Sequence, residues 1–120
     1  MRKYFKLSEL ACKCDLCAGK CNIGLKGISE KLFVVLNAIR EKIGKPVIVN
    51  SGYRCPTHNR RIGGSSNSQH MHGTAADIRW ADMDIDEAAK IAEECGADGI
   101  GKYATFIHVD VRGNKARWNG

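Results

Sequence analysis

Hydrophobic residues recur at helical spacing in the first half of the chain, between residues 28 and 43. The repeating side chains are Ile28, Leu32, Val35, Leu36, Ile39 and Ile43. Positions spaced in this way cover one face of a helix, and Gly44 followed by Pro46 is a typical end signal. The pattern predicts the main core helix of the protein.

A second amphipathic pattern begins at Asp84, and Glu87 three residues later completes a capping box. Its apolar positions share one face and run up to Gly96; they are Ile85, Ala88, Ala89, Ala92 and Cys95. We therefore expect a second helix that packs on the sheet.

Three segments are typical of strands. Residues 46–50 ("PVIVN") predict a short buried strand, and residues 74–80 ("TAADIRW") a second one, with Asp77 on one face. Residues 105–111 ("TFIHVDV") alternate clearly, so that His108 and Asp110 should point the same way. Helices and strands mixed in this order predict an α+β fold, with helices packed on a small, mainly antiparallel sheet.

The length of 120 residues suits one domain, 1–120, with a single modest core. The amino-terminal segment 1–27 is rich in cysteine and is expected to pack on that domain. No apolar run approaches the about 20 residues needed to cross a bilayer. No stretch resembles a signal peptide, so we expect the chain to be cytoplasmic as synthesised. We also expect a monomer.

The formal net charge of +6 is consistent with an anionic partner, although solubility alone explains it equally well. Lys and Arg are spread along the chain, and three Phe, two Trp and three Tyr offer no evident platform for stacking bases. We therefore expect no nucleic-acid partner. The weaker opposing hypothesis is a basic zinc-knuckle protein that binds nucleic acid through its amino-terminal cysteines.

Four of the six cysteines crowd into one short segment, at Cys12, Cys14, Cys17 and Cys21. Neighbours this close make strained disulfides, which leaves two interpretations open: reduced thiols, or a second, structural metal site. Cys55 and Cys95 are interpreted as core cysteines.

Three further side chains could hold a catalytic metal ion: His70, Asp77 and His108. Catalytic zinc takes three protein ligands of this type and leaves one position for water. Neighbouring strands could bring the three together, but on spacing alone they could equally be unrelated polar residues.

The segments "SGYRCPTHNRRIGGSSNSQHMHGTAADIR" and "GIGKYATFIHVDVR" resemble the zinc D-alanyl-D-alanine carboxypeptidase family of bacterial and phage peptidoglycan peptidases. That family shares a fold with the hedgehog signalling domain, so the resemblance implies a hedgehog/DD-peptidase-like fold. The five fixed positions of its ligand signature are filled here by Ser68, His70, Gly73, Ala75 and Asp77.

The resemblance implies that His70, Asp77 and His108 bind Zn²⁺. Arg54, in the matched "SGYR", would hold a substrate carboxylate or the developing oxyanion, and Ser68 would join it in binding substrate. The implied function is zinc-dependent hydrolysis of peptide bonds in peptidoglycan stem peptides, by a D-Ala-D-Ala carboxypeptidase or a murein endopeptidase. The protein would reach the cell wall only if released or exported.

One position departs from the family. Many members place a general base three residues before the last zinc ligand, where this chain has Thr105. Asp110 is the nearest replacement, but it could instead orient His108 or pair with an arginine. His72 falls on a variable position and is interpreted as a cleft-wall residue. His58 is interpreted as a loop histidine.

The departure at Thr105 also supports an alternative function. A non-catalytic module could keep the zinc-containing fold and use it to bind cell-wall peptide or a protein partner.

Overall fold

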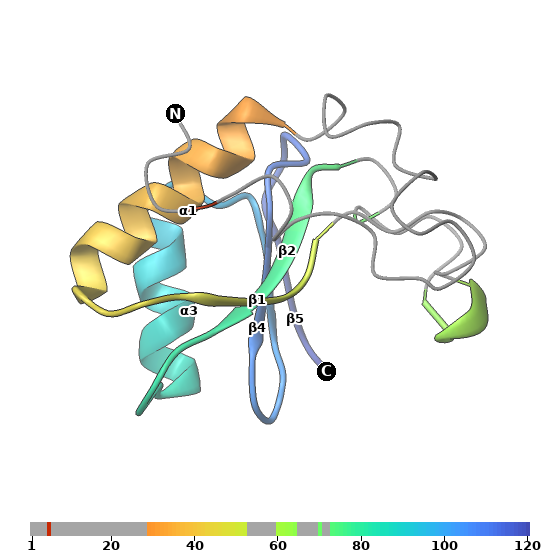
Figure 1. Cartoon of the computed structure of the whole chain (residues 1–120). Coiled ribbons are helices and arrows are strands. Elements are labelled where there is room, and N and C mark those ends of the chain that lie inside the picture. Colours follow the sequence, from red (N-terminus) through yellow and green to blue (C-terminus); the bar gives the residue numbers. More distant parts are fainter. Residues whose placement is uncertain (1–4, 6–28, 53–59, 65–69, 71–72) are drawn as a thin grey trace.

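A computed structural model describes residue 5 and residues 29–52, 60–64, 70 and 73–120 (Figure 1). In this part of the chain the elements are α1 (Glu30–Ile43), β1 (Ile48–Ser51), β2 (Ala75–Arg79), α3 (Ile85–Glu94), β3 (Gly99–Lys102), β4 (Ile107–Asp110) and β5 (Ala116–Asn119). The strands form one sheet in the order β1-β2-β4-β3-β5. Neighbours are antiparallel except β3 and β5, which are parallel. The predicted α+β class and mainly antiparallel sheet are confirmed.

Both predicted helices are present, with the predicted glycine at the end of α1 and the predicted capping residue at the start of α3. Ser29 caps α1, where its hydroxyl accepts a hydrogen bond from the amide of Leu32 at 3.4 Å. Gly44 ends α1 in the left-handed conformation, with φ 67°, which favours glycine. The carboxylate of Asp84 accepts a hydrogen bond from the amide of Glu87 at 3.2 Å and so begins α3.

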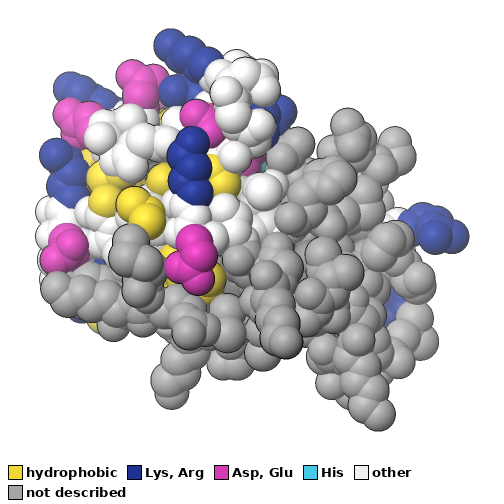
Figure 2. Space-filling model, turned by 90° about the horizontal axis from the view of Figure 1, so that it is seen from above, with side chains coloured by type: hydrophobic (Ala, Val, Ile, Leu, Met, Phe, Trp, Pro, Cys, Tyr) yellow, Lys and Arg dark blue, Asp and Glu magenta, His cyan; other side chains and the backbone are white. Residues whose placement is uncertain are grey.

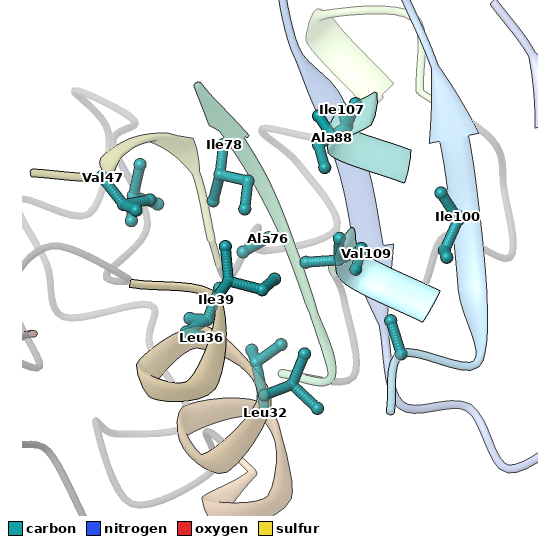
Figure 3. Packing of buried hydrophobic residues seen from close by; sticks show 14 of the residues in the cluster. Leu32, Leu36, Ile39, Val47, Ala76, Ile78, Ala88, Ile100, Ile107 and Val109 are labelled. Atoms are coloured by element: carbon teal, nitrogen blue, oxygen red, sulfur yellow. The ribbon is translucent and has the colours of Figure 1, made fainter. Parts of the chain in front are cut away.

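The core lies between one face of the sheet and the two helices, which are on the same side of it in Figure 1. Figure 3 shows side chains from the helix α1 and from the strands meeting there; they include Leu32, Leu36, Ile39, Ala76, Ile78, Ile100, Ile107 and Val109. Because side chains alternate between the two faces along a strand, the residues between these core positions have their side chains on the opposite face of the sheet. That face carries Asp77, His108 and Asp110.

Strands β3 and β5 were not predicted from the sequence. Gly99 and Gly101 occupy two of the four positions of β3, so this strand has no readable alternation and low intrinsic strand preference. A Cβ at Gly99 would collide with the carboxylate of Asp110, and a Cβ at Gly101 would collide with the indole of Trp118. The two glycines therefore make room for large side chains from the neighbouring strands.

The predicted core cysteine Cys95 lies at the end of α3, partly buried against the core, with a free thiol. Cys55 and the four amino-terminal cysteines lie outside the described residues.

Within the described residues, no helix is long and apolar enough to span a bilayer. On the described part of the face in Figure 2, basic and acidic side chains are interspersed.

We expect the packing of α1 in the core to contribute strongly to the free energy of unfolding. Leu36 is fully buried in the core, so Leu36→Ala should lower the free energy of unfolding by about 2–5 kcal/mol, measured by denaturant titration. The control is Val34→Ala on the same helix, where the side chain is 42% exposed and the change should stay within about 0.5 kcal/mol. Equal effects of the two substitutions would contradict this packing.

Candidate metal centre

The structure brings His70, Asp77 and His108 together in one buried cluster. Each offers one ligand atom, and these atoms all lie within 4.8 Å of one another. Asp77 and His108 are directly opposed in the β2–β4 pair, and His70 precedes β2 in the sequence. The predicted juxtaposition of the three residues is therefore present in the fold.

The hydrogen bonding of His70 determines which of its ring nitrogens faces the cluster. Its Nδ1 lies 2.7 Å from the carbonyl oxygen of Gly52. A carbonyl can only accept, so Nδ1 carries the hydrogen and donates it. The other nitrogen, Nε2, faces Oδ1 of Asp77 at 3.2 Å. In a neutral His70 this Nε2 presents a lone pair.

His108 is held in the complementary way. Its Nε2 lies 2.8 Å from Oδ2 of Asp110, which accepts the Nε2–H, and its Nδ1 lies 3.2 Å from Oδ1 of Asp77. The rings of His70 and His108 meet edge to face, with centroids 5.0 Å apart and planes at 81°. Each imidazole thus turns one nitrogen toward the same carboxylate oxygen.

The contacts within the cluster favour the ionised form of Asp77 and the protonated form of His108. Burial by itself would raise the pKa of Asp77, but hydrogen bonds from His108 and His70 outweigh it and hold that pKa well below its usual range. Burial likewise opposes protonation of His108, but contacts with Asp110 and Asp77 prevail and raise its pKa. A divalent cation bound between the same ligand atoms would take the place of a proton on His108.

The donor set fits zinc. Two imidazole nitrogens and one carboxylate oxygen are the kind of ligands that catalytic zinc sites use, with a further position left for water. All three residues are buried, with His70 at 2% and Asp77 and His108 each at 7% exposure. Buried charged groups of this kind are paired or coordinate a metal.

Asp110 lies on the predicted face beside His108 and is completely buried. Its Oδ1 accepts hydrogen bonds from the Gly99 amide and from Nε of Arg112, both at 3.0 Å, and its Oδ2 accepts from Nη2 of Arg112 at 2.7 Å. Burial opposes ionisation, but the contacts with His108 and Arg112 outweigh it and hold the pKa of Asp110 well below its usual range. Among the described residues, Arg112 is the arginine that pairs with Asp110.

Trp118 is a neighbour of the cluster that sequence reasoning missed. Its ring centroid lies 4.9 Å from that of His108, and the guanidinium of Arg112 lies 5.2 Å from the centre of the indole. The indole N–H donates to the Tyr103 hydroxyl at 2.9 Å. The one sequence signal for this packing was the pair of glycines in β3, which indicates that something large crosses the strand.

Several predicted site residues lie outside the described residues. They are Arg54, Ser68, His58, His72, Cys12, Cys14, Cys17 and Cys21. Thr105 is described and lies exposed in the turn between β3 and β4, three residues before His108. A threonine hydroxyl cannot take a proton from water near neutral pH.

Comparison with known proteins gives two matches. A family model described as Peptidase M15 matches residues 3–110, a range that includes His70, Asp77 and His108. The zinc D-Ala-D-Ala carboxypeptidase of Streptomyces albus G is 39% identical over an alignment of 87 residues that covers 69% of this chain and 34% of that protein. The chain therefore spans about a third of the length of this relative.

We expect the cluster to retain about one zinc ion per chain after dialysis, and replacement of any of its three members by Ala to release that ion. Metal content is measured by atomic absorption, with circular dichroism as the check on folding. Asp86→Ala is the matched control for Asp77→Ala, because the Asp86 side chain is 83% exposed and lies away from the cluster on α3. Full zinc retention by all three variants would sink the assignment.

Proposed function

The chain belongs to the Peptidase M15 family, and from this premise we propose that it is a zinc peptidase acting on peptidoglycan. The bond it hydrolyses would lie in a stem peptide, as in a D-Ala-D-Ala carboxypeptidase or a murein endopeptidase. The main support for the proposal is that ligand atoms of the buried residues His70, Asp77 and His108 lie close together. The similarity to the zinc D-Ala-D-Ala carboxypeptidase of Streptomyces albus G supports both the metal and the substrate class.

The proposed mechanism is metal-assisted amide hydrolysis. A zinc ion held by His70, Asp77 and His108 would polarise the scissile carbonyl and lower the pKa of a water molecule. Within this cluster the chain supplies two neutral nitrogens and one anionic oxygen in a buried setting, where electrostatic interactions are stronger than in water. The rigid strands β2 and β4 hold two of the three ligands in place.

Arg54 and Ser68 complete the proposed site. Arg54 would bind a substrate carboxylate or steady the negative charge of the tetrahedral intermediate, and stem peptides offer such carboxylates. Ser68 would contribute a hydrogen bond to the substrate. Both roles rest on the match of these positions to the family signature.

The contacts of Asp110 bear on whether it could be the general base. Both of its oxygens accept hydrogen bonds, from Gly99, Arg112 and His108, and none of its surface is exposed. These contacts favour the orienting role over the role of base that the sequence left open. Since Thr105 cannot serve either, His72 is the next residue to test as the base.

We also propose a hedgehog/DD-peptidase-like arrangement, supported by the α+β sheet with helices on one face and the cluster on the other. Residues 1–120 would form one such domain, with 1–27 packed on it. Cys12, Cys14, Cys17 and Cys21 could hold a second, structural metal in that segment.

A second candidate function rests on Thr105. Without a base at this position, the protein could keep zinc as a structural element and bind wall peptide or a protein partner without cutting it. The cluster geometry suits both functions, because it holds a metal whether or not water is activated.

Cleavage distinguishes the two. Zinc-loaded protein is incubated with purified peptidoglycan and with a soluble stem peptide ending in D-Ala-D-Ala, and new amino and carboxyl ends are quantified. We expect cleavage by the wild type, with free D-Ala from a carboxypeptidase or internal ends from an endopeptidase. Asp77→Asn should abolish cleavage, because it removes the charge of a metal ligand. Asp86→Asn, at an exposed position, should leave cleavage at the wild-type level.

If the zinc-loaded wild type cuts neither substrate, the peptidase proposal fails. Calorimetric titration with the same stem peptide then tests the alternative: binding without cleavage would support the non-catalytic module.

A further inference from the structure

The carboxylate of Asp110 accepts more hydrogen bonds than a proton acceptor needs, and each of these bonds restrains its position. The backbone amides of Gly99 and Arg112 and the guanidinium of Arg112 all donate to it, at 2.7 to 3.2 Å. The carboxylate is therefore held from two strands, β3 and β4, and by the residues that follow β4. Its remaining contact is the 2.8 Å hydrogen bond from Nε2 of His108.

Gly99 shows that the fold reserves space for this carboxylate. A Cβ at that position would overlap all three terminal atoms of the Asp110 side chain. The backbone of β3 therefore approaches the carboxylate closely enough to donate to it, which any larger residue would prevent.

From these contacts we propose that Asp110 is a positioning residue, which keeps hydrogen on Nε2 of His108 and so commits Nδ1 to the metal. Because a carboxylate only accepts hydrogen bonds, it stabilises the form of His108 with hydrogen on Nε2. Arg112 and Gly99 in turn prevent the carboxylate from rotating toward the cluster. The inference rests on the proposed zinc site, but not on peptide cleavage.

The positive charge of Arg112 also helps to hold the Asp110 carboxylate in place. Its side chain is 26% exposed, whereas that of Asp110 is 0% exposed. The guanidinium therefore pairs with a buried carboxylate while part of its own side chain stays in contact with solvent. Arg112 also lies against Trp118, which packs on His108. The imidazole is thus enclosed by His70, Trp118 and Asp110 and has little freedom to turn.

The test measures zinc affinity at one fixed pH by competition with a chelating dye, independently of any substrate. Asp110→Ala removes the acceptor and should weaken zinc binding by about 10–100-fold, the usual effect of losing a hydrogen-bond partner of a metal ligand. Asp110→Asn keeps one oxygen for His108 and should fall between Asp110→Ala and the wild type. Asp86→Asn, at an exposed position of α3, is the control and should bind zinc like the wild type.

A second readout reports on the imidazole itself. NMR of isotope-labelled histidine in the zinc-loaded wild type should show hydrogen on Nε2 of His108, and Asp110→Ala should lose that preference. The absorption spectrum of the cobalt-substituted protein should change in the same order as zinc affinity. Arg112→Lys keeps the charge but not the paired donors, and should shift both readouts in the direction of Asp110→Ala if the aspartate variants fail to fold.

Two results would overturn the inference. One is wild-type zinc affinity and an unchanged cobalt spectrum in Asp110→Ala. The other is hydrogen on Nδ1 of His108 in the wild type. If cleavage instead falls equally in Asp110→Ala and Asp110→Asn while zinc affinity stays at the wild-type level, Asp110 is the general base. A wild type that binds zinc tightly but cuts nothing would refute the peptidase function and leave this inference standing.

Discussion

Antiparallel hydrogen bonding between β2 and β4 places Asp77 directly opposite His108 and, one position along, Ile78 opposite Ile107. Because side chains alternate along a strand, this register sends the isoleucines into the core and the metal ligands to the other face. A slip of one residue would exchange the two sets, burying charge beneath the helices and exposing apolar surface. The core and the metal centre therefore depend on the same ladder of hydrogen bonds.

Two buried carboxylates on one sheet face need compensation, because an isolated buried charge is costly. For Asp110 the compensation is built into the chain as the guanidinium of Arg112. Asp77 lies 3.2 Å from an imidazole nitrogen of His70 and of His108, and a cation shared by the three groups would compensate its charge. A metal ion and a proton would compete for Nδ1 of His108, whereas Asp110 has the positive charge of Arg112 beside it.

The helices and three of the five described strands could be predicted because their signals are local: the glycine that ends α1, a capping residue at Asp84 and alternation around His108. The metal cluster could be predicted because the alternation and a recognisable signature agree. The contact of Asp110 with the Gly99 amide could not, since Gly99 reaches it only through the register of β3 against β4. Glycine in β3, which weakens the strand signal, is required there by the same contact.

Two of the three metal ligands lie on paired strands, and the third, His70, lies in the sequence between β1 and β2. Asp77 and His108 stand on paired strands, with Asp110 bracing the second of them. Arg54 and Ser68, the proposed substrate-binding residues, also fall in the sequence between β1 and β2. Positions between scaffold elements tolerate substitution more readily than paired strands do. Thr105 is exposed in the turn before β4, so a change of residue at this position would leave intact the strand pairing that places Asp77 opposite His108.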